Sequence, residues 1–166
     1  MNQRNSQSVF DSKRGIVMGF LGPGEDLITG LKKELKKHGI TAGSISCIGS
    51  LSKLSIVQLD YDDNQMSYSK PIRWDSPVEL LSGNGIVGKN EQEELDIHFH
   101  GVFVDHKKNI SGGHFLEGGN IVAITLEFTV ITSEFIQPKR EIEGSLGFPL
   151  FNFYERESKS YKLSDK

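Results

Sequence analysis

The chain has 166 residues, of which 36% are hydrophobic and 25% are charged, and its formal net charge is −3. This length fits one domain that buries a hydrophobic core of its own. The acidic balance argues against a large non-specific nucleic-acid surface, which needs positive charge. The single cysteine, Cys47, excludes an intrachain disulfide and a four-cysteine zinc ribbon.

Residues 1–12 are polar, and we expect them to form a flexible N-terminal segment. They lack the apolar core of a secretory signal, and no apolar run in the chain is long enough to span a membrane. The expected location is therefore the cytoplasm. The apolar run at residues 14–21 predicts a buried strand, which the turn signal Gly22-Pro23-Gly24 ends.

One helix is predicted over about residues 25–38. Apolar side chains recur there at helical spacing and form one stripe: Leu27, Ile28, Leu31 and Leu35. Glu25 and Asp26 stand at the N-terminus, where the helix dipole favours negative charge. Gly39 can adopt the left-handed conformation that ends a helix. The four lysines on the polar side are expected to be solvated surface.

The rest of the chain predicts β-strands separated by turns. They fall at residues 43–49, 51–61, 66–74, 78–87, 95–105, 113–116 and 120–135. The triplet Gly83-Asn84-Gly85 predicts a bulge or tight bend within its strand, and Cys47 is expected to be a small buried core residue. Residues 155–166 are expected to form a terminal strand or a tail. The predicted class is α+β, with an antiparallel or mixed sheet of about eight strands and one main helix packed on it.

The strongest chemical signal is a group of three histidines. Because strand side chains alternate between faces, His98 and His100 project from the same face of the 95–105 strand. Ile97, Phe99 and, less clearly, Val102 are expected to point mostly into the core.

The position of the third histidine depends on the following turn. If Asp105 and Asn109 close a three-residue loop, antiparallel pairing places His114 opposite His100. The glycines at 112 and 113 could form a bulge that aims His114. A register slip of one residue would turn His114 to the other face.

Three histidines and one open position are the ligand set of a catalytic-type zinc site. Neutral imidazole also suits other divalent transition metals, including copper, nickel and ferrous iron. The alternative is that His98, His100 and His114 are partly exposed hairpin residues that bind nothing. His38, at the helix end, and His106, in the turn, are expected to be structural or solvated.

Three carboxylates lie near the histidines in the sequence. Asp96 precedes His98 by two residues and could orient a ligating ring or act as a fourth ligand. Glu117 could lie opposite or diagonal to His98, and Glu127 interrupts an apolar strand and needs a partner or a wet face. For each, the alternative is a solvated strand carboxylate.

Several motifs, in order along residues 14–153, resemble the PPC domain (plants and prokaryotes conserved), in its stand-alone prokaryotic type. The matching pieces are Gly24–Leu27 with the helix that follows, Gly43–Leu51, Val78–Gly85, Ile97–His100, Gly112–Gly118 and Gly147–Leu150. The resemblance assigns residues 13–154 to one PPC-like domain. It implies an α+β fold with a central antiparallel sheet and a homotrimer. It also implies a metal, usually zinc, held by His98, His100 and His114.

The resemblance also implies that the protein is a DNA-binding or regulatory module, with DNA or a transcription-associated protein as its partner. The chain departs from the plant members in two ways: it has no Arg-Gly-Arg-Pro hook, and residues 76–81 lack the arginine and aromatic of the plant partner-binding stretch. Two alternatives stay open. One is a zinc-dependent hydrolase or lyase acting on a small molecule, with Glu117 or Asp96 as general base. The other is a purely structural metal at a subunit boundary.

Overall fold

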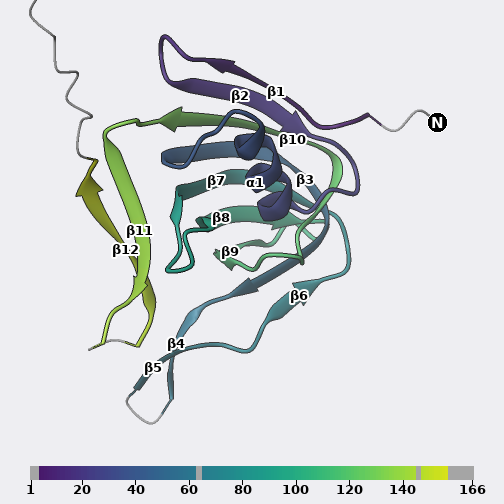
Figure 1. Ribbon diagram of the computed structural model, residues 1–166. Coiled ribbons are helices and arrows are strands. Elements are labelled where there is room, and N and C mark those ends of the chain that lie inside the picture. The colour runs from purple at the N-terminus through teal and green to yellow at the C-terminus, as the bar shows by residue number, and fades with distance from the viewer. Residues whose placement is uncertain (1–3, 63–64, 145–146, 157–166) are drawn as a thin grey trace, which may run out of the picture.

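The computed structural model describes residues 4–62, 65–144 and 147–156. Within them the chain forms one helix and twelve strands (Figure 1). Their bounds, in chain order, are β1 Gln7–Asp11, β2 Ile16–Leu21, α1 Leu27–Lys37, β3 Gly43–Val57, β4 Leu59–Asp62, β5 Gln65–Tyr68, β6 Ile72–Trp74, β7 Val78–Lys89, β8 Leu95–Asp105, β9 Ile110–Phe115, β10 Ile121–Thr132, β11 Ile136–Ile142 and β12 Pro149–Glu155. None of the described residues forms a helix long and apolar enough to cross a bilayer.

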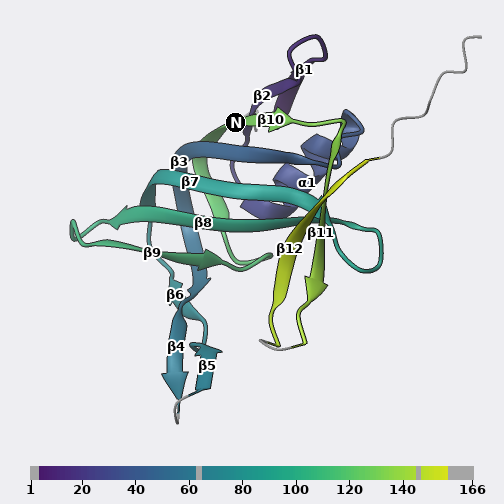
Figure 2. The same ribbon diagram turned by 90° about the vertical axis from the view of Figure 1, so that its left-hand side faces the viewer.

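Ten strands form one mixed sheet in the order β1-β2-β10-β3-β9-β8-β7-β11-β12, with β6 added on β3. β3 also pairs with β7, so β3, β9, β8 and β7 form a closed circuit of pairings. β4 and β5 form a separate two-stranded hairpin, which projects away from the main sheet on the same side as the hairpin end of β11 and β12 (Figure 2). The expected α+β fold of about eight strands therefore needs correction, because the protein is mostly sheet.

The additional strands lie where the local pattern was weakest. β1 falls within residues 1–12 and pairs with β2, and β11 and β12 follow the last predicted strand. The predicted strand at 66–74 is divided into β5 and β6, because Pro71 lies between them and has no backbone N–H for a sheet ladder. Of the predicted C-terminal strand or tail at residues 155–166, Glu155 ends β12, and residues 157–166 lie outside the described residues.

Helix α1 begins and ends at specific capping contacts. The Asp26 carboxylate accepts a hydrogen bond from the Thr29 backbone N–H at 3.0 Å and another from the Asn120 N–H at 2.9 Å. At the other end Gly39 has φ +68, its N–H donates to Lys36 O, and the next N–H returns to Leu35 O. This pair of bonds is the Schellman arrangement. The expected glycine stop is confirmed, and the acidic start is specifically an N-cap.

Replacing Asp26 by alanine should therefore destabilise the fold by about 2 kcal/mol, because it removes the cap and the bond to the chain before β10. Urea denaturation of wild type, Asp26→Ala and Asp26→Asn measures this. The asparagine variant keeps one acceptor oxygen and should lose less stability than the alanine variant. Equal stability of all three proteins would contradict the capping role.

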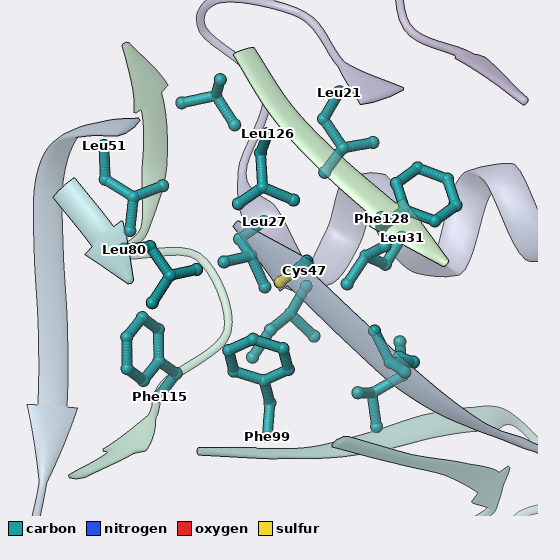
Figure 3. Close-up of a cluster of buried hydrophobic side chains, with 14 of the residues drawn as sticks. Leu21, Leu27, Leu31, Cys47, Leu51, Leu80, Phe99, Phe115, Leu126 and Phe128 are labelled. Atoms are coloured by element: carbon teal, nitrogen blue, oxygen red, sulfur yellow. The ribbon is translucent and has the colours of Figure 1, made fainter. Parts of the chain in front are cut away.

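The core lies between α1 and the sheet face that it covers (Figure 3). Phe99 and Phe115 are fully buried and meet edge to face at 5.2 Å. Cys47 is buried beside them, as predicted, and burial raises the pKa of its thiol to about 12. A Cβ at Gly83 would lie 2.4 Å from the Phe99 ring and 2.8 Å from the Cys47 sulfur, so this position needs glycine.

A bulge is present in β7, but it precedes the predicted triplet Gly83–Gly85. The register shift lies between Leu80 and Ser82 against β8 and between Leu80 and Gly83 against β3, and β7 then runs through the triplet without interruption. The glycines mark the close approach of Phe99 instead of a break in the strand.

The opposite face of the sheet has no helix on it. Its exposed side chains include large apolar ones: Met18, Ile48, Val102 and Ile131. The expected inward orientation of Val102 is wrong, because Val102 is 45% exposed and Gly101 and Phe103 occupy the buried positions of this part of β8. His98 and His100 lie on this same helix-free face by alternation along β8.

Candidate metal centre

The hairpin of β8 and β9 sets the positions of the three histidines. The Asp105 N–H donates to Asn109 O at 3.0 Å and closes a tight turn, and the Asp105 carboxylate accepts the Asn109 N–H at 2.9 Å. This turn gives the register in which His100 lies directly opposite His114. The predicted loop and pairing are confirmed.

The two glycines before His114 do not form the expected bulge. Gly113 pairs with Gly101, and Gly112 with Val102, without a register shift. A Cβ at Gly112 would lie 2.6 Å from Gly101 O, and one at Gly113 would lie 2.9 Å from Val57 O. The glycines therefore let β9 lie close between β8 and the end of β3.

The three imidazoles converge. His98 Nε2 and His100 Nε2 are 3.0 Å apart, and His114 Nδ1 is 3.3 Å from the same His100 nitrogen. The ligand atoms of all three lie within 4.8 Å of one another. Nitrogens around a tetrahedral zinc, each at about 2.0–2.1 Å from the metal, are about 3.3 Å apart. The spacing and the donor type both fit a divalent transition metal.

The pKa of each of the three imidazoles is lowered, and burial is the largest cause. For His98 the charges of Arg140 and His100 add to burial and bring the pKa to about 4, although Asp96 acts in the opposite direction. For His114 the other two histidines and Arg140 also bring it to about 4. His98 and His114 are therefore neutral at pH 7, the form that coordinates metals.

The predicted carboxylates next to the site are held in ion pairs. Asp96 meets Arg140 at 3.1 Å and Lys32 at 3.4 Å, and Glu117 meets the same Lys32 at 2.7 Å. Burial raises the pKa of Asp96, but the charges of Arg140 and Lys32 outweigh it and the net pKa is lowered. Within the described residues, the group with metal-ligand spacing consists of the three histidines without either carboxylate.

The remaining predicted residues lie elsewhere. His38 caps α1, and its Nε2 is 2.9 Å from Ser8 Oγ. His106 is in the β8–β9 turn. Glu127 is on the exposed face of β10, where its carboxylate accepts a hydrogen bond from Thr125 at 2.6 Å.

Two neighbours of the site were not predicted. Arg140 comes from β11, and Tyr68 of β5 packs its ring against His114 at 5.5 Å. Both come from strands outside the histidine hairpin, and neither has a motif around it. The chain had no local signal that would connect them with the histidines.

Comparison with solved structures supports the fold. A "putative DNA binding protein" from Bacteroides thetaiotaomicron superposes with a TM-score of 0.76 at 18% identity, covering 90% of this chain and 99% of that one. A metal-containing protein from Archaeoglobus fulgidus gives 0.69 at 22%, covering 92% and 99%. A plant- and prokaryote-conserved (PPC) protein from Pyrococcus horikoshii gives 0.70 at 23%, covering 92% and 97%. No curated protein matches the chain in sequence.

A family model matches most of the sequence. It describes the Plants and Prokaryotes Conserved (PCC) domain, and the match covers residues 10–134, which include α1, β8, β9 and the three histidines. The resemblance seen in the ordered motifs is therefore confirmed, and the chain belongs to the Plants and Prokaryotes Conserved domain family.

Proposed function

We propose that this protein is a homotrimeric, metal-binding regulatory module in which His98, His100 and His114 hold Zn²⁺ or another divalent transition metal. The observation that carries the proposal is the convergence of the ring nitrogens, two of them 3.0 and 3.3 Å from His100 Nε2. A bound metal would crosslink β8 and β9 and would act as a Lewis acid at its open position. The description of the Archaeoglobus fulgidus relative as metal-containing also supports it.

Metal content tests the proposal. Wild-type protein, purified without added chelator, should contain about one metal ion per chain by mass spectrometry, and a His98→Ala/His114→Ala variant should contain close to none. Circular dichroism of both proteins controls for folding. A folded wild type that neither carries metal nor binds added Zn²⁺, Ni²⁺ or Co²⁺ would exclude the site.

The affinity for metal should also depend on pH in a specific way. Protons compete with a metal only below the pKa of its ligands, and the pKa is lowered to about 4 in both His98 and His114. Zinc affinity, followed by competition with a chelator of known pH dependence, should change little from about pH 7.5 to about pH 5.5. It should fall steeply as the pH approaches 4. A decline that begins near the ordinary histidine value of 6.5 would contradict the lowered pKa values.

The uncovered sheet face supports the trimer. Met18, Ile48 and Ile131 are each more than half exposed there, and apolar groups gathered on one face gain stability when a second subunit covers them. Light scattering should give the mass of three chains for wild type and of one chain for Ile48→Asp. A trimer that survives chelation would separate assembly from metal binding and would exclude a metal whose only role is to hold subunits together.

We further infer that the partner is DNA or a transcription-associated protein. The "putative DNA binding" description of the Bacteroides thetaiotaomicron relative supports DNA. The lysines of α1 offer little free charge to phosphates, because three of them are ion-paired: Lys32 with Asp96 and Glu117, Lys33 with Glu25, and Lys37 with Glu34. A gel-shift titration across salt separates the two. Binding that weakens steeply with salt would identify DNA, and no binding at low salt would favour a protein.

A zinc-dependent hydrolase or lyase is the second candidate, favoured by the position that three histidines leave open on a four-coordinate metal. It ranks lower because both candidate bases, Asp96 and Glu117, are ion-paired with Lys32, and a lowered pKa makes Asp96 a weaker base. Metal-loaded protein can be assayed with a panel of hydrolase and lyase substrates. Turnover lost in Glu117→Gln with metal retained would support this candidate, and the absence of turnover would exclude it.

A further inference from the structure

Two aromatic rings from distant segments lie against the histidine site. The ring of Tyr68, the last residue of β5, is 5.5 Å from the His114 ring with an interplanar angle of 41°. Phe148, just before β12, meets Tyr68 edge to face at 5.3 Å and 74°. The two hairpins whose ends point the same way in Figure 2, β4–β5 and β11–β12, therefore touch through these rings beside His114. We call Tyr68 and Phe148 the aromatic pair.

The β4–β5 hairpin is held in place at its base. Gln58 and Ser69 exchange two hydrogen bonds there, at 2.8 and 3.1 Å. The Gln58 side chain donates to Gly112 O of β9 at 2.8 Å, two residues before His114. Because β9 carries both His114 and this acceptor, the position of Tyr68 is tied to the strand that presents the histidine.

The β11–β12 hairpin is also fixed relative to the site. Arg140 donates to Asp96 of β8 at 3.1 Å and, through Nε, to Pro149 O at 3.3 Å. These bonds connect β8 to the start of β12, next to Phe148. Both members of the aromatic pair thus come from hairpins anchored to the strands that carry the histidines.

We propose that Tyr68, supported by Phe148, is a positioning residue that holds the His114 ring in its coordinating orientation and slows the release of the metal. This inference rests on the proposed function. Outer partners fix the orientation of metal-binding imidazole rings; they are usually hydrogen-bonded to the second ring nitrogen, and their loss typically costs 10–100-fold in affinity. A ring contact such as that of Tyr68 restrains the imidazole without this bond, so we expect an effect at the lower end of that range. His114 has the Tyr68 ring as such a contact, and a ring at this distance should limit the access of water to one side of the imidazole.

The rate of metal release tests the proposal. Zn²⁺-loaded protein is mixed with excess chelator, and release is followed with a chromophoric indicator. Tyr68→Ala should release zinc about tenfold faster than wild type, and Phe148→Ala should lie between them. Tyr68→Phe should behave as wild type, because the contact is made by the ring. Tyr61→Ala is the matched control, since Tyr61 lies on the same hairpin and is 70% exposed.

The outcomes separate cleanly. Equal release from Tyr68→Ala and wild type, or equal acceleration by Tyr61→Ala, would overturn the positioning role. The same proteins without metal are treated with diethyl pyrocarbonate, and carbethoxylation of His114 is measured by peptide mass spectrometry. Faster modification in Tyr68→Ala than in Tyr68→Phe supports the contact, and equal rates overturn it. If wild type binds no zinc, the proposed function fails by itself, and the modification rates still report on Tyr68.

Discussion

Replacing His100 by alanine is expected to lower the affinity for Zn²⁺ by at least about a hundredfold, beyond the 10–100-fold that loss of an outer contact costs. His100 Nε2 lies 3.0 Å from the His98 nitrogen and 3.3 Å from the His114 nitrogen, so it is the atom that both other ligands share as a neighbour. Without it two imidazoles remain, and a four-coordinate metal then has two positions without a protein ligand. Competition with a chromophoric chelator at pH 7 measures the affinity.

The control is His106→Ala, which removes a histidine from the turn of the same hairpin without touching the convergent rings. This variant should bind Zn²⁺ as wild type does. Because His100 is on the exposed face of β8, His100→Ala should keep the fold, which thermal denaturation without metal verifies. Wild-type affinity in His100→Ala, or an equal loss in His106→Ala, would show that the metal binds elsewhere.

The histidine site could be predicted because its geometry is local. Alternation along one strand and the length of one turn were enough to bring His114 opposite His100. The surroundings of the site were not predictable in this way. Tyr68 and Arg140 reach it from β5 and β11, and a long-range contact of this kind depends on how the whole sheet closes.

The fold was predictable where hydrophobic periodicity and capping were strong. Helix α1 and its Gly39 stop follow from a clear apolar stripe and one turn residue. β1 and β11 were missed because they lie toward the edges of the sheet, where less of a strand is buried and polar residues replace the alternating pattern. Pro138 within β11 weakened its signal further.

Replacing Phe99 by alanine is expected to destabilise the protein by about 3–5 kcal/mol, the usual cost of removing a fully buried phenylalanine ring. Phe99 has no exposed surface and packs edge to face on Phe115. Gly83 of the neighbouring strand lies so close to the Phe99 ring that a Cβ at this position would clash with it, so the strand is shaped around this side chain. Urea denaturation of metal-free protein measures the loss directly.

Phe99 also lies between His98 and His100 in β8, on the opposite face, so its loss tests how far the core supports the site. Phe135→Ala is the control, because Phe135 is 69% exposed and its replacement should change stability by no more than about 0.5 kcal/mol. Saturating Zn²⁺ stabilises only the folded state, so it should recover part of the stability of Phe99→Ala if the hairpin keeps its register. This recovery of stability requires that the three imidazole rings still converge in Phe99→Ala. A Phe99→Ala protein as stable as Phe135→Ala would mean that Phe99 does not support the core, and the buried packing beneath the histidines would then need a different description.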